Sequence, residues 1–174
     1  MYISRLFSRK EVLSVITEKI SEIRERMEAA KARRRSDLTD DVRLVAVTKN
    51  HDAEAMREAI AAGAEIVGES RVQEAEKKYV LFRNTVEWHL IGHLQTNKAK
   101  QAVRIFDVIE SVDSEKLANA INKEAEKIGK MQDILVQVNL AREQQKSGVI
   151  ESRRNTPCFS YGDIRRVPRI CASN

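Results

Sequence analysis

Two hydrophobic periodicities divide this chain. Over residues 9–35, apolar positions recur every three or four residues among Glu, Lys and Arg, which predicts one amphipathic helix. The apolar stripe of this helix consists of Val12, Ile16, Ile20, Ile23 and Met27. Ser8 and Glu11 have the spacing of a capping box at its start, and residues 36–40 have the composition of a turn.

From residue 43 onward, short apolar runs alternate with helical patterns. The runs are rich in β-branched residues, as in strands covered on both faces, and they lie at 43–49, 65–68, 86–91, 106–112 and 133–139. Helical patterns occupy 53–62, 71–82, 97–103 and 114–128. Ser114 fits an N-cap, and Gly63 and Gly129 fit the position just after a helix. This order predicts an α/β fold with a parallel sheet, either a barrel of the TIM type or an open doubly wound sheet.

Composition narrows the class of protein further. The chain has 174 residues, of which 42% are hydrophobic and 33% charged, as expected for a soluble globular domain. It contains no apolar run of about 18 residues, which argues against a membrane-spanning helix. The N-terminus shows no secretory pattern, so we expect a cytoplasmic location. Cys158 and Cys171 lack the spacing of a disulfide framework or a metal site, and we expect no bound metal.

The net charge of +5 is concentrated at the two ends of the sequence. Residues 1–40 hold ten basic and seven acidic residues, and residues 151–174 hold five basic and two acidic ones. The densest run, 31–35, closes the first predicted helix, where cations face the negative end of the helix dipole; a phosphate-binding patch is the alternative. Aromatic residues are few and no glycine-rich nucleotide loop occurs, so we expect no nucleic-acid partner.

In parallel α/β folds, function gathers where strands end. At these ends the sequence places Lys49; Gly68, Glu69 and Ser70; His89, Gly92, His93 and Gln95; Ser111 and Asp113; and Asn139, followed by Lys146, Ser147 and Gly148. Lys49 is the most suggestive, because an amine at the end of an apolar strand is expected to be partly desolvated. A neutral amine attacks an aldehyde to form a Schiff base. The alternative is a lysine whose ammonium group simply reaches solvent.

The neighbouring polar residues have structural interpretations as well. His89 and His93 are four residues apart but flank a strand-to-loop junction, which favours hydrogen-bonding roles over metal ligation. Glu69 is a candidate acid or base, or a cap for the helix that begins near residue 71. Trp88 is expected to pack in the core.

Several motifs, taken in order, resemble the pyridoxal phosphate homeostasis family. The matching segments are Leu44–Lys49 (LVAVTK), Gly68–Glu74 (GESRVQE), Trp88–Lys98 (WHLIGHLQTNK), Val138–Asn139, Glu143 and Lys146–Gly148 (KSG). The family is similar to the barrel domain of alanine racemase without its second domain. The resemblance covers residues 9–150, and the segment from the tryptophan to the lysine is very specific.

The resemblance implies a (β/α)₈ barrel that holds pyridoxal 5′-phosphate (PLP) on Lys49 as a Schiff base. It implies further cofactor-binding roles for Ser70, His89, Asn139 and Lys146. Members are described as monomeric, cofactor-binding proteins of intracellular vitamin B6 balance, without an established reaction, so we expect no enzyme activity. At position 70 the family usually has Asn, and the shorter Ser replaces a direct hydrogen bond near the cofactor with none or with a water-mediated one.

After Ile150 the resemblance stops. Family members continue through three further strands, whose loops hold the phosphate, whereas residues 151–174 form a basic segment without strand or helix pattern. The sequence therefore predicts an incomplete barrel domain of about five βα units over 1–150 and an irregular tail over 151–174, as a truncation or a frameshift would produce. Exposed edges at the first and fifth strands would favour self-association, and PLP affinity would be weakened.

Three alternatives stay open at this point. A racemase-like PLP enzyme needs a second acid or base across the cofactor, and Tyr2, Tyr79 and Tyr161 do not lie at predicted strand ends. The basic ends of the chain suggest a nucleic-acid-binding protein, which salt-dependent retention would reveal. The third alternative is a non-functional family remnant that keeps the first five units without the ligand.

Overall fold

A computed structural model describes residues 9–34, 41–139 and 169–173, with side-chain surroundings given for 15–34 and 41–139. Its centre is a six-stranded sheet in the order β1 to β6, in which every neighbouring pair is parallel. The strands are β1 (Val45–Val47), β2 (Ile66–Glu69), β3 (Glu87–Leu90), β4 (Val108–Val112), β5 (Asp133–Asn139) and β6 (Arg169–Ser173). The helices are α1 (Arg9–Lys31), α2 (Ala53–Ala61), α3 (Val72–Phe82), the short 3₁₀ turn η1 (Thr96–Lys98), α4 (Ala99–Ile105) and α5 (Glu115–Lys127).

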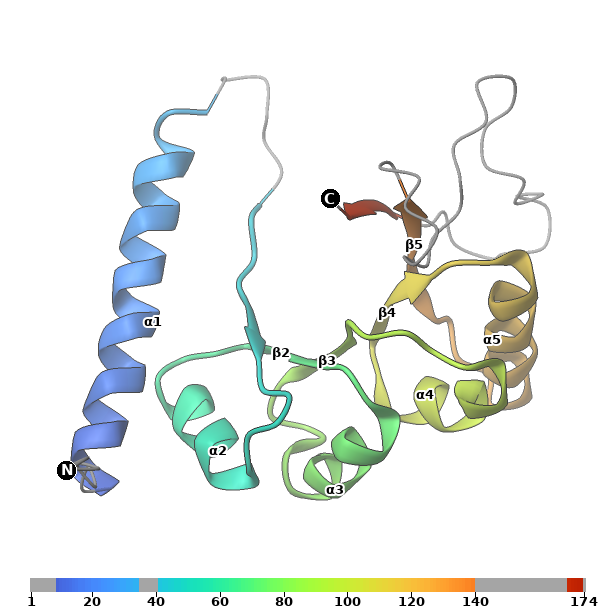
Figure 1. The fold of residues 1–174 in the computed structure, drawn as a ribbon, viewed down its shortest axis with the longest axis horizontal. Helices are drawn as coiled ribbons and strands as arrows, with labels where there is room; N and C mark the ends of the chain where they lie inside the picture. Colours follow the sequence, from blue (N-terminus) through green and yellow to red (C-terminus); the bar gives the residue numbers. More distant parts are fainter. Residues whose placement is uncertain (1–8, 35–40, 140–168, 174) are drawn as a thin grey trace, which may run out of the picture.

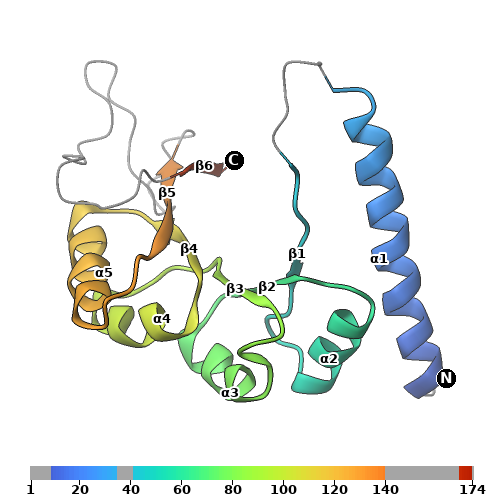
Figure 2. The same ribbon diagram turned by 180° about the vertical axis from the view of Figure 1, so that it is seen from behind.

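Helices α2 to α5 all lie on one side of the curved sheet, as Figures 1 and 2 show from opposite directions. Each helix connects two adjacent parallel strands, and right-handed crossovers of this kind place successive helices on the same face when the strand order does not reverse. The predicted α/β class is confirmed, and the strand order is that of a barrel rather than of a doubly wound sheet. Among the described residues the barrel is incomplete: the sheet has the strands β1 to β5, joined by helices, and β6 from the C-terminal segment.

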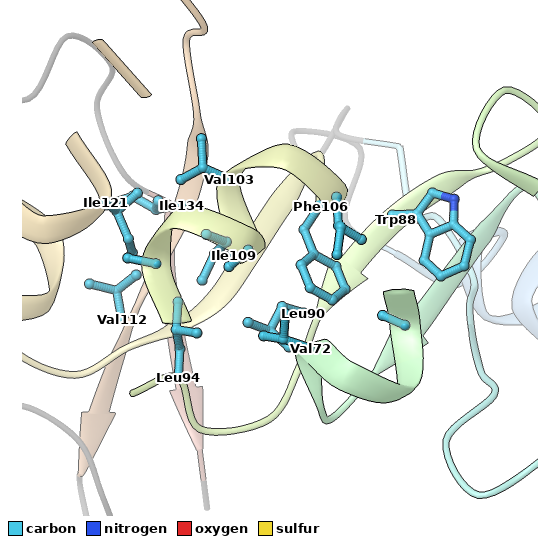
Figure 3. Close-up of a cluster of buried hydrophobic side chains, with 14 of the residues drawn as sticks. Val72, Trp88, Leu90, Leu94, Val103, Phe106, Ile109, Val112, Ile121 and Ile134 are labelled. Carbon is cyan, nitrogen blue, oxygen red and sulfur yellow. The ribbon is translucent and has the colours of Figure 1, made fainter. Parts of the chain in front are cut away.

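The core fills the space between the sheet and its helices. Alternate strand residues, including Trp88, Leu90 and Ile109, are fully buried against the helices, and Figure 3 shows them meeting Phe106 and Leu94. The packing role predicted for Trp88 is confirmed, with Tyr79 contacting its ring edge-on at 5.4 Å between centroids. Because strand side chains alternate, the intervening residues face the other side of the sheet, which curves around a hollow.

The helix ends follow the predicted chemistry. The Ser114 side chain accepts a hydrogen bond from the Leu117 amide and caps α5. Gly63 and Gly129 have φ of +92° and +63° just beyond α2 and α5, a conformation that residues with a Cβ rarely adopt. Helix α1 stands beside α2, and Ile20 packs in a second small cluster there.

The tail differs from the expectation of an irregular segment. Arg169–Ser173 forms β6 and pairs in parallel with Leu135–Asn139 of β5. The prediction of an exposed edge at the fifth strand was therefore wrong. The unpaired N–H and C=O groups along β5 accept an extended segment whether or not its side chains alternate, and hydrophobic periodicity cannot reveal such pairing. Among the described strands, β1 and β6 are the edges. The predicted Ser8 cap lies outside the described residues.

Candidate functional site

The turn after β1 carries Lys49. The ladder continues one residue beyond the strand, since the Thr48 amide donates to the Gly68 carbonyl at 3.0 Å. Thr48 is buried on the helix side, whereas Val45 on the other face of β1 lines the hollow. Lys49 is exposed, which contradicts the expectation of a partly desolvated amine and agrees with the alternative of a lysine that reaches solvent. With β1 at the edge of an open sheet, no further strand covers this position among the described residues.

The turn itself is tight. The His51 amide donates to the Thr48 carbonyl at 3.2 Å, and Asn50 has φ of +62°. Asn is one of the few side chains that tolerate this region, and turns with positive φ at their third residue favour it. Asp52 follows directly and caps α2 by accepting from the Ala55 amide at 2.9 Å. Lys49 is therefore presented between a strand end and a capped helix start.

A buried polar network lies beneath this turn. Lys78 of α3 has its ammonium group 2.8 Å from Glu69 Oε1 and 2.9 Å from the Thr48 carbonyl oxygen. The Thr48 hydroxyl donates to the same Glu69 oxygen at 2.7 Å. Glu69 is fully buried and Lys78 is 5% exposed. The helix-cap interpretation of Glu69 was therefore wrong, because Arg71 is the N-cap residue of α3 and Glu69 instead joins β1, β2 and α3.

Glu74 extends this network to the other side of Lys49. One of its carboxylate oxygens accepts from the Asn50 amide at 2.5 Å and lies 3.4 Å from the Lys78 ammonium group. Burial by itself would raise the pKa of Glu74, but the hydrogen bonds from the Asn50 amide and Lys78 outweigh it and lower this pKa. Glu74 is thus held as a carboxylate, the form that accepts both hydrogen bonds.

Ser70 lies at the end of β2, half-buried, with its backbone against the loop after β3. A Cβ at Gly92 would lie 2.3 Å from the Ser70 carbonyl oxygen, so only glycine allows this approach. The Ser111 hydroxyl donates to the Gly92 carbonyl at 2.6 Å and fixes the loop from the next strand. Val47 pairs with Gly68, so the chain segments after β1 and β2, which carry Lys49 and Ser70, leave the same edge of the sheet.

His89 belongs to a row of charged groups on the hollow side of the sheet. Its Nδ1 is 2.5 Å from Glu110 Oε1 and its Nε2 is 2.9 Å from Glu87 Oε1, while Arg43 donates to Glu87 at 2.5 Å. Burial lowers the pKa of His89, but the hydrogen bonds to Glu110 and Glu87 outweigh burial and raise it above the ordinary 6.5. Both ring nitrogens therefore have partners within the protein, and a direct contact between His89 and a cofactor stays a prediction.

The remaining predicted residues are spread out. Asn139 is buried at the end of β5, across the sheet from β1, and Lys146 lies outside the described residues. His93 is exposed, with its Nδ1 3.1 Å from the Asp113 carboxylate, and does not join His89. Within 9–34, 41–139 and 169–173, no cluster of His, Cys, Asp and Glu is arranged to hold a metal ion. No helix in these ranges is long and apolar enough to cross a membrane.

Sequence reasoning missed Lys78. A signal for it exists, because Lys78 interrupts the apolar stripe of α3, three residues after the buried Ala75 and four before the buried Phe82. A lysine on the buried face of a helix needs an internal partner. The sequence alone does not say which carboxylate on which strand supplies it.

The fold and the strand-end lysine define a class of protein, a partial parallel α/β barrel with an amine at the carboxyl end of its first strand. A family profile described as "Alanine racemase, N-terminal domain" matches residues 19–152, and the chain belongs to this family. A relative named pyridoxal phosphate homeostasis protein, from Aquifex aeolicus, is 38% identical over 145 residues, which are 83% of this chain and 63% of that protein. One of the same name from Synechocystis sp. is 40% identical over 113 residues, 64% of this chain and 52% of that protein.

Solved structures agree with this assignment. PipY of Synechococcus elongatus with PLP bound superposes with a TM-score of 0.64 and 39% identity, covering 78% of this chain and 58% of that one. Alanine racemase from Streptomyces coelicolor, with a TM-score of 0.62 and 16% identity, shares the fold over 81% of this chain and 35% of that one. This chain spans roughly half to two thirds of the length of the first curated relatives that it matches.

Proposed function

We propose that this chain binds pyridoxal 5′-phosphate through a Schiff base on Lys49 and serves intracellular PLP homeostasis. The observation that carries the proposal is the exposed amine on a fixed turn at the carboxyl end of β1. Its support comes from the family, because a relative at 39% identity is titled as a PLP-bound structure. The relatives named pyridoxal phosphate homeostasis protein support the proposed role.

The residues present fit the aldehyde end of the cofactor. An exposed primary amine is an accessible nucleophile in the fraction of molecules where it is neutral. Lys49 would hold the cofactor by condensing with its aldehyde, so that a C=N bond would replace the C=O bond and the carbonyl oxygen would leave as water. Ser70, half-buried just after β2, would reach the bound cofactor through a water molecule rather than directly, because its side chain is shorter than Asn.

The described residues offer more to the aldehyde of the cofactor than to its phosphate. In barrels of this type the phosphate group is often held by loops after strands seven and eight, at the N-terminus of a short helix. The described sheet ends with β6, which comes from the tail. Among the described residues, the covalent link on Lys49 therefore carries the larger share of the proposed binding.

We propose binding without catalysis. Racemisation requires a second proton donor or acceptor across the cofactor from the lysine. Tyr79, the tyrosine among the described residues, packs edge-on against Trp88 beneath the helices and is not on the hollow side. Incubation of the loaded protein with L-alanine should leave its chirality unchanged, and formation of D-alanine would contradict this part of the proposal.

A spectral titration tests the proposal. Added PLP should produce the visible absorbance band of a lysine imine, and the Lys49→Ala variant should lose it. Lys77→Ala is a matched control, since Lys77 is an exposed lysine on α3 and should keep the band. An unchanged band in the Lys49 variant would overturn the assignment.

A further inference from the structure

We propose that the buried pair Glu69 and Lys78 are positioning residues, which hold the turn of Lys49 in the orientation that favours imine formation. The inference rests on the proposed function, since it concerns the same amine. Neither residue contacts the reacting atoms. Both act through the backbone next to Lys49. Lys78 contacts this backbone directly, and Glu69 acts on it through Lys78.

The network holds the two peptide groups that flank Lys49. The carbonyl oxygen of Thr48, in the preceding peptide, accepts from the Lys78 ammonium group at 2.9 Å. The amide of Asn50, in the following peptide, donates to the Glu74 carboxylate at 2.5 Å, and Lys78 lies 3.4 Å from the same oxygen. The Lys49 Cα is therefore fixed from both sides by groups that converge on one ammonium.

Glu69 holds Lys78 and Thr48 together. Its Oε1 accepts from Lys78 at 2.8 Å and from the Thr48 hydroxyl at 2.7 Å, so the end of β1 is tied by side chain as well as by carbonyl. The three acceptors around Lys78 match the three protons of an ammonium group. Removal of Lys78 would leave a buried carboxylate and a buried carbonyl without this donor.

A stabilising role alone does not account for the pair. Buried ion pairs gain little net stability over apolar residues of similar size, because both charges are desolvated. Glu69 Oε2 is also buried and has no hydrogen-bond partner among the described residues, which adds to the cost. An apolar pair would join α3 to β2 at lower cost, but it could not hold the Thr48 carbonyl or support Glu74.

The test separates position from stability with three variants. Lys78→Met removes the donor and leaves Glu69 unpaired, whereas the double variant Glu69→Leu with Lys78→Met replaces the pair with apolar side chains. Lys130→Met is the matched control, because half-buried Lys130 also donates to backbone carbonyls, those of Val103 and Phe106, at the other end of the sheet. PLP titration, urea unfolding and amide exchange of the cofactor-free protein are measured for each.

The double variant should regain stability relative to Lys78→Met and still show apparent PLP affinity lowered roughly tenfold to a hundredfold, a typical effect of losing a supporting contact. The Asn50 and His51 amides should exchange faster in both variants. Lys130→Met should match the wild type in PLP affinity and at these amides, whatever its stability. Wild-type PLP affinity and wild-type exchange in the double variant would overturn the inference.

Failure of the proposed function is distinguishable from failure of this inference. If Lys49→Ala keeps the imine band, the site of PLP attachment is wrong. Amide exchange at Asn50 and His51 is measured without PLP and still reports whether Glu69 and Lys78 hold the turn. Unchanged exchange in the double variant would contradict the positioning role even if Lys49 is the attachment site.

Discussion

Gly92 lies where the loop after β3 crosses the backbone of Ser70. The Gly92→Ala variant should lose roughly 1–3 kcal/mol of unfolding free energy, because the new methyl group would lie 2.3 Å from a carbonyl oxygen that cannot move freely. The same variant should weaken PLP binding through displacement of Ser70. Gly129→Ala is the control: its Cβ would have no neighbour within 4 Å, and only its φ of +63° opposes the change. Urea denaturation should show the larger loss at position 92.

His89 gives the chain a pH dependence of known sign. Its pKa is raised in the folded protein, because the hydrogen bonds to Glu110 and Glu87 raise this pKa by more than burial lowers it. The resulting stability is fully present below the unfolded pKa, near 6.5, and is lost as the pH rises through the higher folded pKa. The unfolding free energy should therefore fall as the pH rises from about 6.5 through the raised folded pKa of His89.

His89→Gln removes the titrating group and should flatten that part of the profile. Arg43, which forms an ion pair with Glu87, stays charged over the whole pH range of the measurement. It therefore adds no pH dependence of its own. Equal slopes for the wild type and the variant between pH 6 and 9 would contradict the assignment of this dependence to His89.

At the scale of single residues, the sequence identifies Lys49 because its position at the end of an apolar run is local information. The sequence leaves open whether the Lys49 amine is partly desolvated or reaches solvent, because the answer depends on whether a further strand lies beside β1, opposite β2, and among the described residues none does. For Glu69 the sequence offers a helix cap as one of two interpretations, because the next helix is close in sequence. Its partner Lys78 is nine residues away, and their contact exists only once α3 has folded back on β2.

The elements follow the hydrophobic period closely. All five strands expected between 43 and 139 form, with β1 shortened to Val45–Val47 and α4 preceded by the 3₁₀ turn at Thr96–Lys98. Strand β6 could not be predicted, because Arg169–Ser173 has no alternation and its pairing depends on the free edge of β5. The ends of a helix or strand depend on tertiary contacts that the pattern does not encode.

Helix α1 has its own small contact region. Ile20 packs with Ala59 and Ala64 in a cluster separate from the main core, and the Arg24 guanidinium donates to the Gly63 carbonyl at 2.5 Å. Ile20→Ala should weaken the docking of α1 by roughly 2 kcal/mol. Hydrogen exchange should then speed up in α1 while β2 to β5 stay protected, since local openings follow separate clusters. Uniform loss of protection would show that α1 and the sheet unfold as one unit.

At the scale of the whole molecule, the described sheet has two edges, of which β6 is one and β1 the other. Val47 is 48% exposed in this strand, and an apolar edge invites pairing with another chain. Self-association should therefore rise with concentration in sedimentation velocity. Val47→Lys should reduce it, because a charge on an edge strand opposes strand pairing. The same distribution of species in both proteins would place the contact elsewhere.

The central claim concerns which nitrogen holds the cofactor. The loaded protein is reduced with borohydride, digested, and mapped by mass spectrometry for the pyridoxyl group. The account predicts one modified peptide, the one that contains Lys49, with the other lysines unmodified at equimolar PLP. Modification spread over many exposed lysines, or centred on a different one, would contradict it.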